Sequence, residues 1–207
     1  MKLAVLDFDS TVMDGETIDF LARETGQEEA VAKLTEAAMQ GEMDFFGALQ
    51  QRVKLLKGMK ESRLNEICHN LPLMPGAKEL ISELKARDYM VAIFSGGFRN
   101  ATRHFKDIVG YDAEFSNTLH AKDGLLTGLV GGEMMFDTSK GELLQRLQGL
   151  MNIDRSNTLV CGDGANDLSM FKHADTRIAF CAKPVLREQA TIIIEDKDLR
   201  NIIPELK

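Results

Sequence analysis

After a short opening run, the hydrophobic positions follow first a helical spacing and then an alternation of helical and extended patterns. The apolar run at residues 3–6 stops at an acidic pair and predicts a first buried strand. From residue 16 to about residue 70 the apolar spacing is helical and proline is absent, which predicts a succession of helices. These helices are expected at 16–25, 28–40, 44–56 and 60–70, with breaks at glycines.

Beyond a proline-containing break at 71–76, helical and extended patterns alternate. Helices are expected at 77–87, 100–106, 140–151, 165–173 and 199–203. Strands are expected at 89–94, 112–115, 158–161, 177–180 and 191–194, with a hairpin within 120–136. This alternation predicts an α/β fold, a doubly wound, mostly parallel sheet with helices on both faces.

The early helical block interrupts this alternation between the first and second strands. We therefore expect residues 1–12 and 75–207 to form the α/β core, and residues 13–74 to form an inserted helical-bundle cap above the strand ends. A lid in that position can exclude water from a site at the same edge.

Composition narrows the class of protein. The 207 residues, 44% of them hydrophobic, suffice for one sizeable core, and the apolar runs are too short for a membrane span or a signal peptide. A net charge of -7 argues against a nucleic-acid partner but leaves room for an anionic small molecule. The three cysteines lack metal-binding spacing, which favours reduced thiols and a cytoplasmic location. We expect a monomer or a homodimer.

Two acids, Asp7 and Asp9, follow the first strand at the sheet edge where open α/β sheets bind ligands. Neighbouring acids there repel each other and are costly to desolvate unless a proton or a cation relieves them. Carboxylate ligands of this kind suit Mg²⁺. On these residues alone, a solvated turn remains the alternative, because Asp and Ser also favour turns.

Three more segments are expected at the same edge. Ser95-Gly96-Gly97 has the composition of an anion cradle, although a plain strand-to-helix turn has the same pattern. Lys140 stands at a helix start, where its charge does not complement the helix dipole; it is either a phosphoryl ligand or a solvated surface residue. The stretch at 162–167 holds two acids, an amide and two glycines, more than an Asx turn or a helix cap requires.

In order and spacing, these four segments resemble the four motifs of the haloacid dehalogenase-like phosphatases, over essentially the whole chain. Within that superfamily the sequence is most similar to the phosphoserine phosphatase family. The similarity to the phosphoserine phosphatase family in particular comes from Glu16, from the segment between Phe45 and residue 56 that contains Arg52, and from the strings 162–171 and 179–184.

The resemblance implies phosphoryl transfer through an aspartyl-phosphate. It assigns Asp7 as the nucleophile and Asp9 as the general acid and base. Burial under the lid would raise the pKa of Asp9. It places Mg²⁺ between Asp7, the main-chain carbonyl of Asp9, and Asp163. Asp167 would orient Lys140 or a metal-bound water.

The same resemblance implies how the substrate is held. Phosphoryl oxygens would contact Ser95, the Gly96 amide, Lys140 and Asn166. Glu16 would meet the ammonium of phosphoserine and Arg52 its carboxylate, with Phe45 closing over the bound molecule. Without the resemblance, Glu16 would be interpreted as a helix-start acid, Arg52 as an exposed helix residue and Phe45 as a core residue.

The expected function is therefore hydrolysis of O-phospho-L-serine to L-serine and phosphate, the last step of serine biosynthesis. Three alternatives stay open, of which the first is a related phosphatase of the same superfamily that acts on another small phosphomonoester. The aspartyl-phosphate could pass to another alcohol such as homoserine, because acceptor choice depends on pocket shape. A phospho-accepting signalling module also uses clustered acids and Mg²⁺, but it does not need the helical insertion with Glu16 and Arg52.

Overall fold

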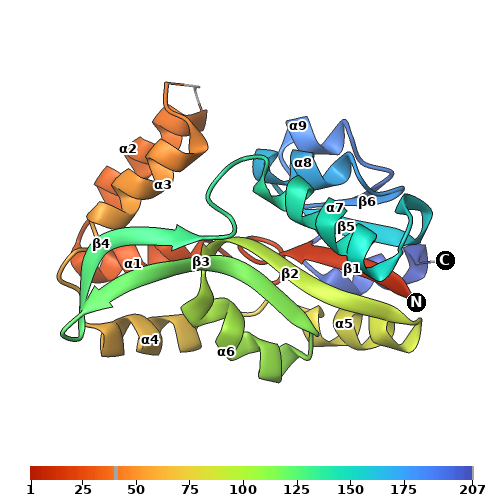
Figure 1. The fold of residues 1–207 in the computed structure, drawn as a ribbon, viewed down its shortest axis with the longest axis horizontal. Helices are drawn as coiled ribbons and strands as arrows, with labels where there is room; N and C mark the ends of the chain where they lie inside the picture. The colour runs from red at the N-terminus through yellow and green to blue at the C-terminus, as the bar shows by residue number, and fades with distance from the viewer. Residues whose placement is uncertain (40–41, 207) are drawn as a thin grey trace.

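A seven-stranded sheet in the order β4-β3-β2-β1-β5-β6-β7 forms the centre of the molecule (Figure 1). The computed structural model describes residues 1–39 and 42–206. Neighbouring strands run parallel except β3 and β4, which are antiparallel. The strands are β1 (Lys2–Asp7), β2 (Tyr89–Phe98), β3 (Ala113–Lys122), β4 (Leu125–Gly132), β5 (Thr158–Gly162), β6 (Thr176–Phe180) and β7 (Ile192–Ile194).

Helices cover both faces of the sheet. The α-helices are α1 (Thr17–Thr25), α2 (Glu28–Met39), α3 (Phe45–Lys54), α4 (Glu61–His69), α5 (Ala77–Ala86), α6 (Arg99–Val109), α7 (Ser139–Met151), α8 (Leu168–Phe171) and α9 (Pro184–Arg187). The 3₁₀ helices are η1 (Arg155–Asn157), η2 (Ala165–Asp167) and η3 (Leu199–Glu205). Figure 1 shows α5 and α6 below the sheet and α7, α8 and α9 above it.

The central strand β1 explains this two-sided packing. Its side chains alternate between the two faces, as in every strand, and all from residues 3 to 6 are fully buried. Leu6 belongs to the cluster that contains Leu80 of α5, whereas Val5 belongs to the cluster that contains Leu144 of α7. A strand with two buried faces reads as a continuous apolar run, which is the pattern that predicted it.

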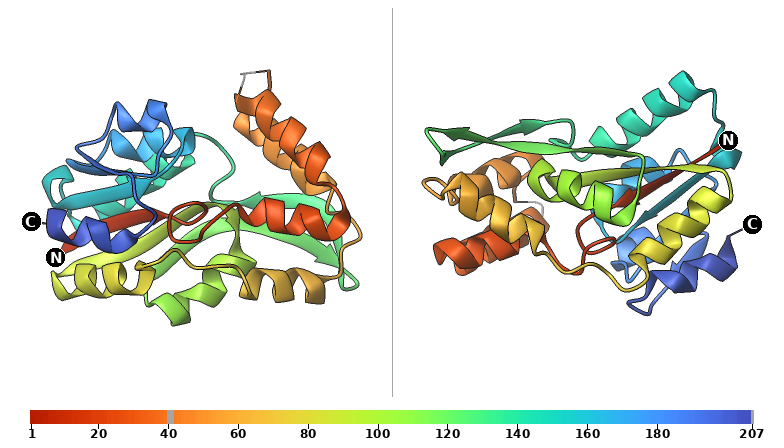
Figure 2. Two further views of the ribbon diagram at one scale, coloured as in Figure 1. Left: turned by 180° about the vertical axis from the view of Figure 1, so that it is seen from behind. Right: turned by 90° about the horizontal axis from the view of Figure 1, so that it is seen from below.

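Part of the helical segment between β1 and β2 projects from the sheet, although Leu49 of α3 and Leu64 of α4 share a buried cluster with Leu6. Figure 2 shows α2 and α3 as a pair that projects away from the sheet, while α4 lies beside α6. The backbone at residues 58–60 pairs with β4, with Gly58 N donating to Leu126 O at 2.8 Å and Leu126 N to Met59 O at 2.9 Å. The segment thereby covers part of the free edge of β4, which would otherwise expose unpaired backbone groups.

The predicted fold class is confirmed, and so is the existence of most predicted elements. The predicted helix at 28–40 ends at Gln40, which lies outside the described residues. The four-residue helix α9 was not predicted, because its length carries no periodicity. Within the described ranges, no helix is long and apolar enough to cross a membrane. All three cysteines are free thiols.

Three predicted boundaries are wrong. The expected strand at 112–115 and the hairpin within 120–136 are one hairpin, because β3 runs unbroken from residue 113 to 122 before it turns into β4. The predicted helix at 165–173 is a 3₁₀ turn followed by the single turn of α8. Strand β2 continues to Phe98 instead of ending at residue 94, with a register shift against β3 between Phe94 and Phe98.

Candidate active site

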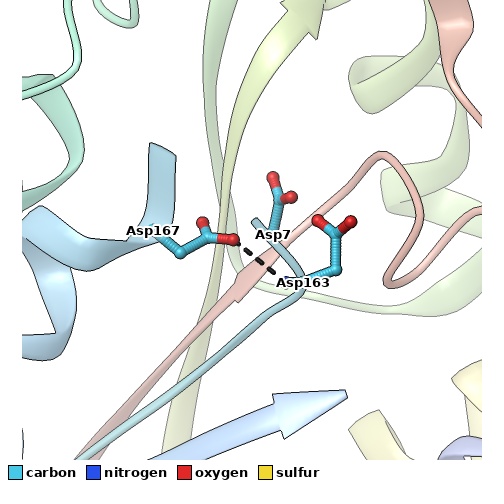
Figure 3. A group of neighbouring side chains, drawn as sticks. All are labelled: Asp7, Asp163 and Asp167. Carbon is cyan, nitrogen blue, oxygen red and sulfur yellow. Dashed lines mark hydrogen bonds between the residues drawn. The ribbon is translucent and has the colours of Figure 1, made fainter. Parts of the chain in front are cut away.

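Three carboxylates converge at the carboxyl ends of β1 and β5. Asp7 ends β1, Asp163 follows β5, and Asp167 closes η2. One carboxylate oxygen from each lies within 4.8 Å of the others, and Figure 3 shows Asp167 extending toward Asp7 and Asp163, whose carboxylates lie side by side. Asp167 Oδ2 accepts from the backbone N–H groups of Asp163 at 3.1 Å and Gly164 at 3.2 Å, which fixes the loop.

Lys140 supplies positive charge to this cluster. Its Nζ donates to Asp7 Oδ1 and to Asp167 Oδ1, each at 2.6 Å, and Lys140 is only 3% exposed. Burial alone would lower the pKa of Lys140, but the charges of Asp167 and Asp7 outweigh burial and raise it. The lysine is therefore a buried cation rather than a solvated surface residue.

The remaining charge balance favours a bound cation. Burial and the charge of Asp167 raise the pKa of Asp7, although Lys140 acts in the opposite direction. Burial and Asp167 likewise raise the pKa of Asp163 to about 6. Both shifts mean that burial, together with the charge of Asp167, disfavours the ionised carboxylates more than Lys140 favours them. A divalent metal coordinated by carboxylate oxygens would neutralise their charge, so the donor set fits such an ion.

Asp9 lies beside the cluster and contacts the helix that follows. Asp9 Oδ1 accepts from Thr17 N at 2.9 Å and from Thr17 Oγ1 at 2.5 Å, at the first residue of α1. Its other oxygen accepts from Ser95 Oγ at 3.4 Å. Burial raises the pKa of Asp9, while the bonds from Thr17 lower it, so the raising effect of burial prevails.

Ser95, Gly96 and Gly97 belong to the last part of β2, where the backbone lies close against Asp9. Gly97 N donates to Ser95 Oγ at 2.9 Å, and Ser95 is fully buried. A Cβ at position 97 would stand 2.4 Å from Asp9 Oδ2, so this position requires glycine. Asn117 of β3 donates to the Gly96 carbonyl at 3.0 Å, which satisfies a backbone group where the regular β2–β3 pairing is interrupted.

A pocket of about 510 Å³ opens over these groups. Its lining includes most of the predicted site residues: Asp7, Asp9, Glu16, Phe45, Arg52, Gly96, Asp163 and Asn166. Ser95, Lys140 and Asp167 lie behind the wall as buried groups. All the predicted site residues therefore gather around one cavity, with the helices α1 and α3 on one side and the strand ends on the other.

Glu16, directly before α1, and Arg52, on α3, line the pocket. Ser10 Oγ donates to Glu16 Oε1 at 2.8 Å. Although solvent reaches Glu16 through the pocket, the surrounding protein and the charge of Asp9 raise its pKa to about 8. Burial lowers the pKa of Arg52, whose Nε donates to Ala48 O at 3.3 Å, and no ion pair joins Arg52 to a carboxylate of the described chain. Its guanidinium is available to an anionic ligand.

Four residues of this region were not assigned a role from the sequence. Thr17 and Asn117 act through contacts that only the folded chain reveals. Asp19 and Lys183 line the pocket, and Lys183 N donates to Asp163 O at 2.8 Å. Lys183 belongs to the string 179–184 that resembles the family, and Asp19 lies one helical turn after Glu16 on the same face. Both positions therefore indicated a place at the site.

The comparisons with known proteins agree with this geometry. A family model of haloacid dehalogenase-like hydrolases matches residues 1–175. The phosphoserine phosphatase of Wolinella succinogenes is 61% identical over 206 residues, which is 100% of both chains. A solved phospho-aspartyl intermediate analogue of a phosphoserine phosphatase has a TM-score of 0.94 and 47% identity, covering 100% of this chain and 99% of the other. A substrate-bound phosphoserine phosphatase matches with a TM-score of 0.94 and 46% identity over 100% and 98% of the two chains.

Proposed function

We propose that this chain, which belongs to the haloacid dehalogenase-like hydrolase family, hydrolyses O-phosphoserine to serine and inorganic phosphate through an aspartyl-phosphate. The observation that carries the proposal is the convergence of Asp7, Asp163, Asp167 and Lys140 beneath a pocket that also contains Glu16 and Arg52. One end of the pocket suits a phosphoryl group, and the other offers a partner for each charge of an amino acid.

In the first step, a carboxylate oxygen of Asp7 attacks phosphorus while the bond from phosphorus to the serine oxygen breaks. Asp9 donates a proton to the departing oxygen, and its raised pKa supports that role. In the second step, Asp9 takes a proton from water as the water oxygen attacks phosphorus, which releases phosphate and restores Asp7. General acid and base help of this kind contributes roughly 10²–10⁴-fold in rate.

Lys140, Ser95, the Gly96 amide and Asn166 are proposed to hold the other phosphoryl oxygens. The 2.6 Å contacts of Lys140 with Asp7 and Asp167 support this, because they fix its ammonium beside the proposed nucleophile. Asp167 would orient Lys140. A fixed positive charge stabilises the transferring group without reorganisation during the reaction.

We propose Mg²⁺ as the divalent metal, held by Asp7, Asp163 and the main-chain carbonyl of Asp9. When bound, it would neutralise charge so that an anionic nucleophile can approach an anionic phosphate. The three clustered carboxylates, together with the raised pKa values of Asp7 and Asp163, support a hard cation with oxygen ligands. Asp167 belongs to the same cluster and would orient a water bound to such an ion.

Substrate choice is proposed to depend on the helices above the pocket. Glu16 would accept hydrogen bonds from the ammonium of phosphoserine, and Arg52 would bind its carboxylate through two parallel N–H groups. Residues 13–74 would act as the lid and residues 1–12 with 75–207 as the core, with Phe45 over the phosphate end. A cytoplasmic location and a monomeric or dimeric state remain predictions.

The direct test measures phosphate and serine release from O-phosphoserine by the purified protein with Mg²⁺, beside a panel of small phosphate monoesters. The proposal expects phosphoserine to have the highest kcat/KM, and a flat profile across the panel would contradict it. Repeating the reaction with homoserine and looking for phosphohomoserine separates water from another alcohol as the final acceptor.

A further inference from the structure

An exposed aromatic residue, Phe136, lies at the rim of the pocket in the segment between β4 and α7. It is 56% exposed, although an aromatic side chain of this size is usually buried. Its ring stacks on Phe46 of α3 with centroids 5.2 Å apart and planes 24° apart. In Figure 1, the connection from β4 to α7 rises between the α2–α3 pair and the α7–α9 layer.

The chain neighbours of both stacked residues line the pocket. Phe45 precedes Phe46, and Asp137 follows Phe136. The Phe45 ring also reaches the proposed phosphate cradle, because its Cζ stands 3.3 Å from the place that a Cβ on Gly96 would occupy. The stack therefore lies next to the part of the pocket wall that Phe45 and Asp137 form, and it joins α3 to the segment before α7.

The backbone is held on both sides of the stack. Phe136 N donates to Ser139 Oγ and Ser139 N donates to Phe136 O, each at 3.1 Å, and Ser139 directly precedes Lys140. On the other side, Asp44 caps α3 by accepting from Gly47 N at 2.6 Å. Two fixed backbones present the two rings, so the ring contact sets the spacing between α3 and the segment that leads to Lys140.

We propose that Phe136 is a positioning residue of the lid: by stacking on Phe46 it keeps Phe45 over Gly96 and so completes the wall around the bound phosphoryl group. The proposal rests on the proposed function in taking the helices above the pocket as its lid. Phe136 acts through Phe46 and Phe45 and does not itself contact the substrate.

The size of the effect follows from the contact. An aromatic pair of this geometry shifts an equilibrium by roughly twofold to tenfold beyond its area burial. Loss of the ring should therefore raise KM by that factor, because substrate binds productively when the wall is complete. Chemistry in the closed state is unchanged, so kcat should change by less than about twofold.

A double-mutant cycle tests the pair. The variants are Phe136→Ala, Phe46→Ala and the double variant, with Phe136→Tyr to restore a ring and Leu129→Ala as the matched control. Leu129 is 59% exposed on β4 and does not line the pocket, so it has the same kind of exposure without the contact. Each variant is assayed for kcat and KM, and for the midpoint of thermal unfolding.

We expect Phe136→Ala and Phe46→Ala to raise KM, the double variant to raise it no further than either single variant, and Phe136→Tyr to keep the parent value. The unfolding midpoint of Phe136→Ala should match that of Leu129→Ala, whereas Phe46→Ala and the double variant should have a lower midpoint because the Phe46 ring also packs against the core. Additive effects on KM, or a KM that no variant changes more than Leu129→Ala does, would overturn the proposal. A lower midpoint with an unchanged KM would show a purely structural role and overturn it as well.

The assay substrates separate this proposal from the proposed function. KM is measured for both O-phosphoserine and an aryl phosphate, since closure over the phosphoryl group affects any monoester. If the parent protein turns over the aryl phosphate but not phosphoserine, the proposed function is wrong, and the double-mutant cycle on KM for the aryl phosphate still tests the role of Phe136. If both are turned over and the cycle is additive, only the role of Phe136 fails.

Discussion

Replacement of Lys140 by methionine tests the buried charge arrangement most directly. Methionine has a similar length but no charge and no N–H donor. It would leave Asp7 and Asp167 without the two 2.6 Å bonds that they accept. The side chains of Lys140, Asp7 and Asp167 are 4%, 3% and 0% exposed, so bulk water has little access to replace those bonds.

The expected loss is large because the pair is buried. Removing one partner of a buried ion pair destabilises a protein by about 3–5 kcal/mol, a sizeable part of a typical unfolding free energy of about 5–15 kcal/mol. Lys197 offers a matched control. It bonds Asp14 at the same distance, 2.6 Å, but the two side chains are 66% and 41% exposed. An exposed pair contributes about 0–1 kcal/mol, so Lys197→Met should change stability little.

The free energy of unfolding of both variants is measured by urea denaturation of the metal-free protein at pH 7 and at pH 5. Burial and Asp167 already raise the pKa of Asp7, and loss of the cation raises it further. Asp7 in the folded variant then binds more protons than it does in the unfolded chain, so this group stabilises the folded variant more as the pH falls from 7 to 5. The difference in unfolding free energy between the parent and Lys140→Met should therefore be smaller at pH 5 than at pH 7. Equal unfolding free energies for Lys140→Met and Lys197→Met at pH 7 would refute the reasoning.

The other expectations concern turnover. Asp7→Asn should abolish phosphate release while the circular dichroism spectrum stays that of the parent, and appreciable activity would exclude Asp7 as the nucleophile. Arg52→Ala should lower kcat/KM for phosphoserine at least about tenfold more than for an aryl phosphate, because a charged hydrogen bond is lost; equal losses would contradict carboxylate binding. Burial raises the pKa of Glu16 to about 8, so the carboxylate ionises as the pH rises through that value. Accordingly, kcat/KM for phosphoserine should rise between pH 6 and 8 in the parent but not in Glu16→Gln, and parallel profiles would remove Glu16 from ammonium binding. EDTA should stop turnover and Mg²⁺ should restore it, whereas activity that is indifferent to EDTA would rule out the metal assignment.

The sheet could be predicted from the sequence because its central strands are local signals. The apolar run at 3–6 is buried on both faces, and no distant residue is needed to recognise it. The end of β2 could not be predicted in the same way. Ser95-Gly96-Gly97 has the composition of a turn, yet the strand continues to Phe98 because Asn117 of β3 satisfies the Gly96 carbonyl at the register shift.

In the candidate site, too, some residues could be predicted from the local sequence pattern, whereas others depend on contacts between segments that are distant in the chain. The acids at 7, 9 and 163 could be picked out by their positions after strands. Lys140 could not be recognised as buried from its own surroundings, because its partner Asp7 lies 133 residues away in the chain. Thr17 is only eight residues from Asp9, but their contact depends on how α1 turns back over the end of β1. Likewise, an exposed phenylalanine such as Phe136 has no sequence signal until its stacking partner is known.

The buried charges link stability to function at this sheet edge. Asp163 and Asp7 have raised pKa values, so the folded protein holds their charge at a cost that Lys140 offsets only in part. A phosphate monoester would add about two more negative charges beside the same carboxylates. The arrangement is therefore unfavourable for a bare anion and favourable for an anion that enters with a hard cation. Apolar residues in these positions would make a more stable fold, and they would remove the electrostatic reason for a cation and a phosphate to bind there together.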